Sequence, residues 1–447
     1  MTEAKKMTQK QKSAFTPKLR FPEFQNDSAW TPVTLRDVSV PVEEKVGDRK
    51  LTPVSISAGI GFVPQAEKFG RDISGNQYKQ YTVVRDGDFV YNKGNSLRFP
   101  QGCIYQLRGW GEVAAPNVFI CFRLKEGYSD GFFQSCFEKN IHGIQLQRHI
   151  TSGARSNGLL NISRDTFFDI KIPTPSLAEQ QKIAECLSTL DELIEAESRK
   201  LNALKDHKKG LMQQLFPREG ETRPRLRFPE FRSSPDWTTR RMNEIYAFLA
   251  NNSFSRDRLN YVSGSIKNIH YGDIHKHHRL LFDVTREVVP YINDDALTSE
   301  SQPVFCAEGD MVFADASEDL EDIGKCIEIV NLNNERVVAG LHTILARPKT
   351  RSAFARGFSG YLFSSKRIRA QIQKESQGTK VLGISAKRLA NIELCFPVHV
   401  AEQERIADCL SSLDDLIAAQ SERLEALRAH KRGLMQQLFP NPSEFES

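Results

Sequence analysis

The stretch best suited to metal chemistry is "HYGDIHKHHRL", residues 270–280. It places three histidines close together, namely His275, His277 and His278. No cysteine or carboxylate set accompanies them at a recognised ligand spacing, so we expect no metal site. Lys276 and Arg279 make the stretch cationic, which favours a loop that faces nucleic acid. A solvated loop without a ligand is the alternative.

Two acidic turns raise the question of catalysis. "DGDFVYNK" at residues 86–93 places two aspartates and a lysine close together, as nuclease sites do. The corresponding "EGDMVFAD" at residues 308–315 has no lysine in that position, which favours a structural turn in both places. The chain also lacks the P-loop, the G-x-G-x-x-G fingerprint and the N-P-P-Y or D-P-P-Y loop of base methylation. We therefore expect no catalytic residue in this chain.

Two further loops combine cations with glycine in a way that suits DNA contact. They read "YNKGNSLRFPQG" at residues 91–102 and "TSGARSNG" at residues 151–158. Glycine lets the backbone approach phosphate, and Arg and Asn side chains can read guanine and adenine edges. Near "SQGTKV", Lys380 is only a rough counterpart of Arg155. The predicted DNA-binding residues are Lys93, Arg98, Arg155, Asn157, His275, Lys276, His277, Arg279 and Lys380.

These candidate sites lie in a chain that repeats itself once. "LRFPEF" begins at Leu19 and again at Leu226, and a tryptophan follows at the same distance each time. "LAEQQKIAECLSTLDELI" is matched by "VAEQERIADCLSSLDDLI", and "HKKGLMQQLFP" by "HKRGLMQQLFP". The front part of each copy has diverged, whereas the back part is nearly identical. The sequence is therefore a tandem duplication with no short solenoid period.

The matched back part of each copy predicts a helix of about 39 residues, or roughly 58 Å at 1.5 Å per residue. Apolar residues recur in steps of four and three, which is a heptad pattern. Prolines stand before and after each run. We predict that the two helices form an antiparallel coiled coil, although a core helix of a compact domain is the commoner use of such a stripe. The interface residues are Ile183, Leu187, Leu190, Ile194, Leu201, Leu204, Leu211, Leu215, Ile406, Leu410, Leu413, Ile417, Leu424, Leu427, Leu434 and Leu438.

The front parts show short alternating runs such as "QYTVVRDGDFVY" and "APNVFICFRL", which are typical of strands. The predicted fold class is thus α+β, with two pseudo-symmetric mixed α/β domains separated by two long antiparallel coiled-coil helices. The 447 residues carry a net charge of +5, which is compatible with nucleic acid without implying it. The eight cysteines form no C-x-x-C pair, so we expect reduced thiols in a cytoplasmic protein. No apolar run approaches the roughly 20 residues of a membrane span.

The order of these motifs resembles the specificity (S) subunit of type I restriction-modification enzymes. The "LRFPEF" opening, the "SGAR…LNIS" stretch and the "AEQ…IA" helix start occur in that family's order, from about Leu19 to Pro440. The resemblance implies two target recognition domains, each reading one half of an asymmetric, bipartite double-stranded DNA target. It implies two methyltransferase (modification) subunits as partners, and it allows two restriction subunits.

The same resemblance implies a non-catalytic subunit without a cofactor of its own. The methyltransferase partner is expected to use S-adenosylmethionine, and the restriction partner ATP and Mg. A stand-alone DNA-binding or scaffold protein with a duplicated coiled coil is the alternative. The expected parts are a disordered basic tail at 1–18, recognition domain 1 at 19–175, a central spacer helix at 176–217, a linker at 218–225, recognition domain 2 at 226–397, a C-terminal spacer helix at 398–440 and a tail at 441–447.

Overall fold

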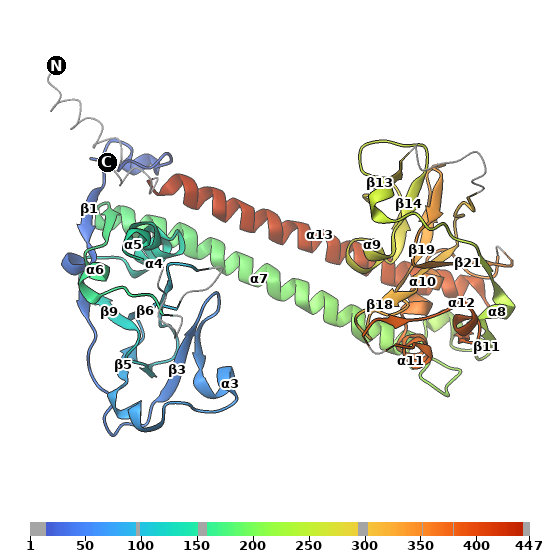
Figure 1. Cartoon of the computed structure of the whole chain (residues 1–447), viewed down its shortest axis with the longest axis horizontal. Coiled ribbons are helices and arrows are strands. Elements are labelled where there is room, and N and C mark those ends of the chain that lie inside the picture. The colour runs from blue at the N-terminus through green and yellow to red at the C-terminus, as the bar shows by residue number, and fades with distance from the viewer. Residues whose placement is uncertain are drawn as a thin grey trace, which may run out of the picture. The chain divides into compact units, whose positions relative to one another are not determined.

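A computed structural model describes residues 15–94, 99–150, 159–293, 303–350, 352–378 and 380–440. The chain divides into two compact units, and Figure 1 shows mixed sheets and short helices in each. Unit 1 is Met1–Ser198 with Arg423–Ser447, and unit 2 is Arg199–Glu422. Both boundaries fall inside long helices. The predicted α+β class and the duplication are confirmed.

Unit 1 is built on two sheets and one separate strand pair. The first sheet has the order β2 (Ser39–Pro41), β9 (Ile120–Leu124), β6 (Phe89–Asn92) and β7 (Cys103–Gln106). The second has the order β4 (Gly61–Pro64), β3 (Thr52–Ser57), β8 (Glu112–Ala115) and β5 (Thr82–Arg85). β1 (Thr31–Thr34) pairs antiparallel with β10 (Lys171–Thr174). The short helices are α2 (Leu35–Val38), α3 (Gln65–Phe69), α4 (Asp130–Glu138), α5 (Ile141–Leu146) and α6 (Arg164–Phe168).

Unit 2 repeats this plan with additions. Its larger sheet has the order β12 (Tyr246–Leu249), β21 (Thr343–Pro348), β17 (Met311–Ala314), β19 (Cys326–Asn331) and β15 (Leu281–Asp283). A second sheet has the order β13 (Leu259–Asn260), β16 (Tyr291–Ile292), β14 (Lys267–Ile269) and β20 (Val337–Ala339). The separate pairs are β11 (Thr238–Arg241) with β23 (Glu393–Phe396) and β18 (Ala316–Ser317) with β22 (Leu382–Gly383). The short helices are α8 (Met242–Ile245), α9 (Tyr271–Lys276), α10 (Phe358–Ser364), α11 (Lys366–Glu375) and α12 (Ala386–Leu389).

Each of the two acidic turns holds a buried ion pair. In unit 1 the turn connects β5 to β6, which belong to different sheets. Asp88 is fully buried there and binds Arg123 at 2.6 Å. Asp310 does the same in unit 2, where it binds Arg347 at 2.7 Å. Both turns depend on a buried Asp–Arg pair and not on Lys93, so the second copy can lack a lysine at the corresponding position.

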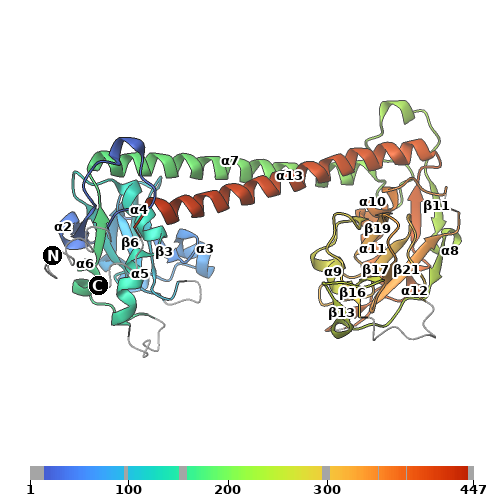
Figure 2. The ribbon, with the colours of Figure 1, turned by 90° about the horizontal axis from the view of Figure 1, so that it is seen from above.

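The long helices are α7 (Leu177–Leu215) and α13 (Val400–Leu438), each 39 residues long as predicted. Figure 2 shows each of them as one uninterrupted helix. In unit 1, Asp191 of α7 binds Lys431 at 2.6 Å and Glu197 binds Arg423 at 2.8 Å. Residue numbers rise along one helix as they fall along the other, so the halves in this unit run antiparallel. No helix in the described part of the chain is long and apolar enough to cross a membrane.

All sixteen residues of the predicted heptad seam are buried or half-buried. The ends of the seam, however, do not pack only helix against helix. Ile183 and Leu187 join the main core of unit 1 together with Leu438. Ile406 and Leu410 join the corresponding core of unit 2. Each core therefore contains the start of one long helix and the end of the other.

A buried three-residue cluster ties each opening motif to a helix start. In unit 1, Arg20 of "LRFPEF" binds Glu179 of "AEQ" at 2.6 Å, with side chains only 8% and 1% exposed. The indole nitrogen of Trp30 donates to the same carboxylate at 3.3 Å. In unit 2, Arg227, Trp237 and Glu402 repeat these contacts at 2.7 and 3.2 Å. We call this arrangement the Arg–Glu–Trp lock.

Further repeated hydrogen bonds surround the lock. The amide oxygen of Gln180 accepts from the backbone N–H of Ser129 at 3.0 Å. In unit 2, Gln403 accepts from Ala355 at 2.8 Å. The N–H of Leu226 donates to the carbonyl of Gln214 at the end of α7, at 2.9 Å. The motifs that recur in the sequence are thus the residues that attach each domain to its helices.

The lock predicts a large loss of stability when its carboxylate is removed. Glu402→Ala would leave the buried Arg227 guanidinium without its counter-charge, with only backbone carbonyls to accept from it, and the Trp237 N–H without its acceptor. Breaking a buried pair in this way typically costs about 3–5 kcal/mol. Urea unfolding followed by tryptophan fluorescence would measure the loss. Glu230→Ala removes an exposed partner of Arg405 in the same unit and should have a small effect. An equal response of the two variants would contradict the role of the lock.

Candidate nucleic-acid interface

The predicted DNA-contacting residues of unit 1 are mostly outside the part described. Arg98, Arg155 and Asn157 all lie outside the described residues. Lys93 is half-buried, and its amine lies 3.4 Å from the carbonyl oxygen of Ile162. Lys93 is thus a less accessible cation than its loop sequence suggested.

The histidine-rich stretch is wrongly predicted as a loop, because part of it is the helix α9. His270 caps that helix, and its ring accepts a hydrogen bond from the N–H of Gly272 at 3.1 Å. Burial and the neighbouring Arg256 lower the pKa of His270. Asp273 is buried and binds Arg256 at 2.7 Å. Ion pairing and capping fix this segment as a helix. The spacing of apolar residues over so short a stretch could not predict that helix.

The stretch contains both structural and accessible side chains. His275 is half-buried and its Nε2 lies 3.0 Å from the carbonyl oxygen of Ala316. His278 is buried, and its Nδ1 lies 3.1 Å from Glu287. Lys276, His277 and Arg279 are exposed, and their side chains have no ion-pair partner within the described residues. Lys380, on its separate turn, is exposed as well.

The described ranges hold no group of three His, Cys, Asp or Glu side chains that could bind an ion. All eight cysteines are free. Six of them are buried, and the other two, Cys186 and Cys409, occupy matching positions on α7 and α13. Burial raises the pKa of the Cys103 thiol to about 11, which keeps it protonated at neutral pH.

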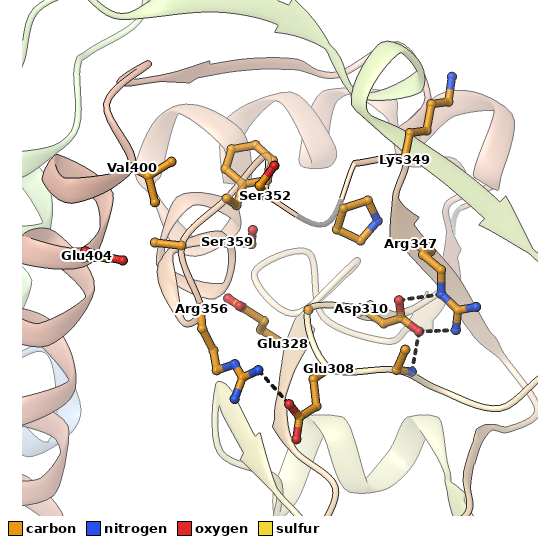
Figure 3. A pocket seen from close by; sticks show the side chains of 15 residues that line it. Glu308, Asp310, Glu328, Arg347, Lys349, Ser352, Arg356, Ser359, Val400 and Glu404 are labelled. Carbon is orange, nitrogen blue, oxygen red and sulfur yellow. Dashed lines mark hydrogen bonds and ion pairs between the residues drawn. The ribbon is translucent and has the colours of Figure 1, made fainter.

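A cavity of about 770 Å³ in unit 2 lies beside the second acidic turn. Figure 3 shows the two arginines of the cavity facing carboxylates, with Arg347 against Asp310 and Arg356 against Glu308. Both guanidinium groups are thus neutralised, and the third cation, Lys349, donates to the carbonyl oxygen of Asn243 at 2.7 Å.

The buried carboxyl of this cavity belongs to Glu328. Its two oxygens accept from the N–H groups of Gly357 and Gly360, each at 2.7 Å. Burial raises the pKa of Glu328 to about 7, and the two N–H donors offset only part of that effect. Strand register places Gln106 at the matching position in unit 1, opposite Phe89 as Glu328 is opposite Met311.

A second, smaller cavity in unit 2 has a different character. Its volume is about 410 Å³, and it lies between α7, α9, α10 and the start of β19. Four lysines line it, namely Lys205, Lys208, Lys209 and Lys325. None of these lysines was among the predicted DNA-binding residues. The repeated "HKKG" and "HKRG" near the helix ends was a sequence signal for Lys208 and Lys209, whereas no repeated motif marked Lys205 or Lys325.

The chain is similar to proteins of one family. The family model described as "Type I restriction modification DNA specificity domain" matches residues 114–206 and 235–429. The type I restriction enzyme MjaVIII specificity subunit of Methanocaldococcus jannaschii is 28% identical over 295 residues, which are 65% of this chain and 66% of that protein. The putative MjaX specificity subunit of the same organism is 25% identical over 312 residues, 68% of this chain and 64% of that protein. Each match therefore spans just under two thirds of the relative's length.

Solved structures show the same fold. The S subunit of a type I restriction-modification system from M. genitalium aligns with a TM-score of 0.55 at 14% identity, over 95% of this chain and 99% of that one. A chain from a structure on complex assembly and conformational transition of the type I R-M system aligns with a TM-score of 0.52 at 17% identity, over 92% of this chain and 98% of that one. At these identities the likeness concerns the fold alone.

Glu328 predicts that unit 2 loses stability as the pH rises. Its pKa in the folded chain is raised to about 7, so folding favours the protonated form. That contribution is complete below the carboxyl's ordinary pKa and is lost as the pH rises through about 7, at roughly 1.4 kcal/mol per pH unit. Glu328→Gln copies the residue of unit 1 and should remove this dependence. Melting curves between pH 5 and pH 8 would compare the slopes, and identical slopes would refute the assignment.

Proposed function

This chain belongs to the type I restriction modification DNA specificity family, and from that premise we propose that it is the DNA-reading subunit of a methylating complex. Each recognition domain reads one half of an asymmetric, bipartite target. The chain itself carries no catalytic residue. Adenine methylation with S-adenosylmethionine belongs to modification subunits, and ATP- and Mg-dependent cleavage belongs to restriction subunits where these are present.

This proposal rests on one observation. The two recognition domains are attached to the long helices in the same way, although their surfaces differ. The Arg–Glu–Trp lock has the same geometry in both units, so each domain is attached to its helices in the same way. The rest of each unit differs, since unit 2 adds β15 to one sheet. Two surfaces of different composition on equal frames suit two different half-sites, whereas two identical surfaces would suit a palindrome.

Accessible cations supply the DNA contacts in unit 2. Lys276, His277 and Arg279 follow one another around the end of α9, and all three are exposed. Lysine contacts to phosphate position the protein without reading sequence, while arginine can read guanine. We assign Lys276 to the backbone and keep Arg279 as the candidate base reader of this segment.

The partner sites lie on the long helices. Leu193 is 39% exposed and Leu416, at the matching position of α13, is 55% exposed. Large apolar side chains on the outer face of a charged helix suit burial by a partner. Because the flanking residues also match, we infer that two copies of one modification subunit bind here, one on each helix.

A chain with two copies of domain 1 tests the reading of half-sites. Residues 19–175 would replace residues 226–397, with Arg20 and Trp30 meeting Glu402 in place of Arg227 and Trp237. If each domain reads one half-site, the symmetric chain should direct methylation to an inverted repeat of a single half-site. Sequencing of N6-methyladenine in cells that also carry the modification subunit would show the new target.

The reciprocal chain, with two copies of residues 226–397, provides the matched control. The inverted repeat that this chain methylates should be built from the other half-site of the parent's target. A parent chain that binds no DNA with its partners would end the proposal altogether. A symmetric chain that still marks the parent's asymmetric target would show that the domains do not read separate half-sites.

Single changes on the helices test partner binding. Leu193→Asp or Leu416→Asp alters an exposed side chain and should leave the fold intact. Burying a leucine contributes about 1.5–3 kcal/mol, so each change should weaken one site by roughly tenfold or more. Native mass spectrometry should find one modification subunit lost per single variant and two lost in the double variant. Val262→Asp, at an 88% exposed position of unit 2, should keep both partners. Full occupancy in the double variant would place the partner elsewhere.

A further inference from the structure

We propose that the lysine-lined cavity of unit 2 binds a phosphate of the DNA backbone, an inference that rests on the proposed function. The cavity has a volume of about 410 Å³ and is lined by residues of α7, α9 and α10 and by Lys325 before β19. It would make the end of the α7 helix a direct DNA contact, in addition to its part in the coiled coil.

The charge of the cavity is the first reason. Four lysines line it, and no aspartate or glutamate does. Lys208 is neutralised by Asp414, and Lys325 donates to the carbonyl of His275 at 2.7 Å. Lys205 and Lys209 are exposed, and within the described residues neither has an ion-pair partner. Two free ammonium groups at one opening attract an anion.

A buried imidazole on the same wall is the second reason. The side chain of His278 is 0% exposed, and its Nδ1 lies 3.1 Å from Glu287. Its other ring nitrogen, Nε2, is buried without a hydrogen-bond partner among the described residues. A buried polar atom without a partner is uncommon in native structures and calls for a ligand or water.

The matching place in unit 1 is the third reason, because a carboxylate occupies it there. Gly131 of α4 and Gly357, just before α10, face matching alanines, Ala184 of α7 and Ala407 of α13. Seven residues after each glycine stand Glu138 in unit 1 and Ser364 in unit 2.

Glu138 binds Lys431, the counterpart of Lys208, at 3.0 Å. Burial alone would lower the pKa of Lys431, but its bonds to Asp191 and Glu138 outweigh this and raise it. Unit 1 thus supplies its own anion, whereas unit 2 has a serine and an open cavity.

The neighbouring residues favour DNA over a small anion. Lys276 and Arg279 are exposed and lie close in the chain to His278 and Leu280 of the cavity wall, so they add positive charge beside the cavity. Positive charge that continues beyond one pocket fits a polyanion, since duplex DNA carries about one negative charge per 1.7 Å of its axis.

The test transfers the unit 1 carboxylate to unit 2. Ser364→Glu should place a carboxylate near Lys208, as Glu138 is placed near Lys431, and so exclude phosphate. Lys205→Ala with Lys209→Ala removes the two free charges from an exposed helix surface. This double variant tests the site even if the new glutamate of Ser364→Glu does not reach Lys208. Both would be assembled with the modification partner, and duplex binding would be measured across a salt series. Loss of one phosphate contact lowers the salt slope by about one unit, equally for target and non-target DNA.

The counterpart in unit 1 supplies the control. Arg428→Ala with Arg432→Ala removes two cations from the matching helix positions and should leave the salt slope nearly unchanged. Unchanged slopes in Ser364→Glu and in the lysine pair, with normal binding by the parent, would overturn this site but not the proposed function. A different outcome is that both variants bind the modification subunit poorly, while the complexes that do assemble bind DNA as the parent does. In that case the cavity would bind an acidic segment of the partner protein, and the inference would be wrong.

Discussion

The structure depends on a buried arginine and glutamate that share a tryptophan. Removing two charges from water is costly, and a buried ion pair adds little net stability over an apolar replacement. Its value here is positional. Glu179 and Glu402 lie in the first turn of the long helices, and each takes the arginine and the indole N–H of the segment that opens a recognition domain. An apolar contact would tolerate sliding, whereas these charged and directional bonds fix one orientation of the segment on the helix.

Equal attachment allows the two domains to diverge. Once the lock, the amide of Gln180 or Gln403 and the core of each unit hold a domain in place, residues further out are free to change. Glu138 closes a basic site in unit 1 that Ser364 leaves open in unit 2. Gln106 in unit 1 corresponds to the buried Glu328 in unit 2, so the second unit has a carboxyl with a pKa of about 7 where the first has an amide that does not titrate. Symmetry in the frame and asymmetry around it together suit a protein that recognises two unlike half-sites with two like partners.

The long helices have more than one role. Their apolar seam continues into the core of each unit, so a domain cannot shift without disturbing helix packing. Their outer faces keep Leu193 and Leu416 exposed at matching positions. The last turns of α7 carry lysines to the wall of a cavity. Under the proposed function both the spacing of the domains and partner binding depend on the long helices, which fits how little of their sequence differs between the copies.

The sequence by itself determined the duplication, the two 39-residue helices and the family, because these depend on long periodic or repeated patterns. It also marked Arg20, Trp30 and Glu179 as repeated residues, although it could not say that they meet. The tertiary structure alone decided that the Asp88 turn holds an arginine, that His278 is buried and that Lys205 and Lys325 share a cavity. Such facts depend on contacts between residues far apart in the chain, which neither composition nor spacing encodes. It also turned residues 271–276 into a helix, since capping and the Asp273–Arg256 pair outweigh the weak preferences of a short histidine-rich segment.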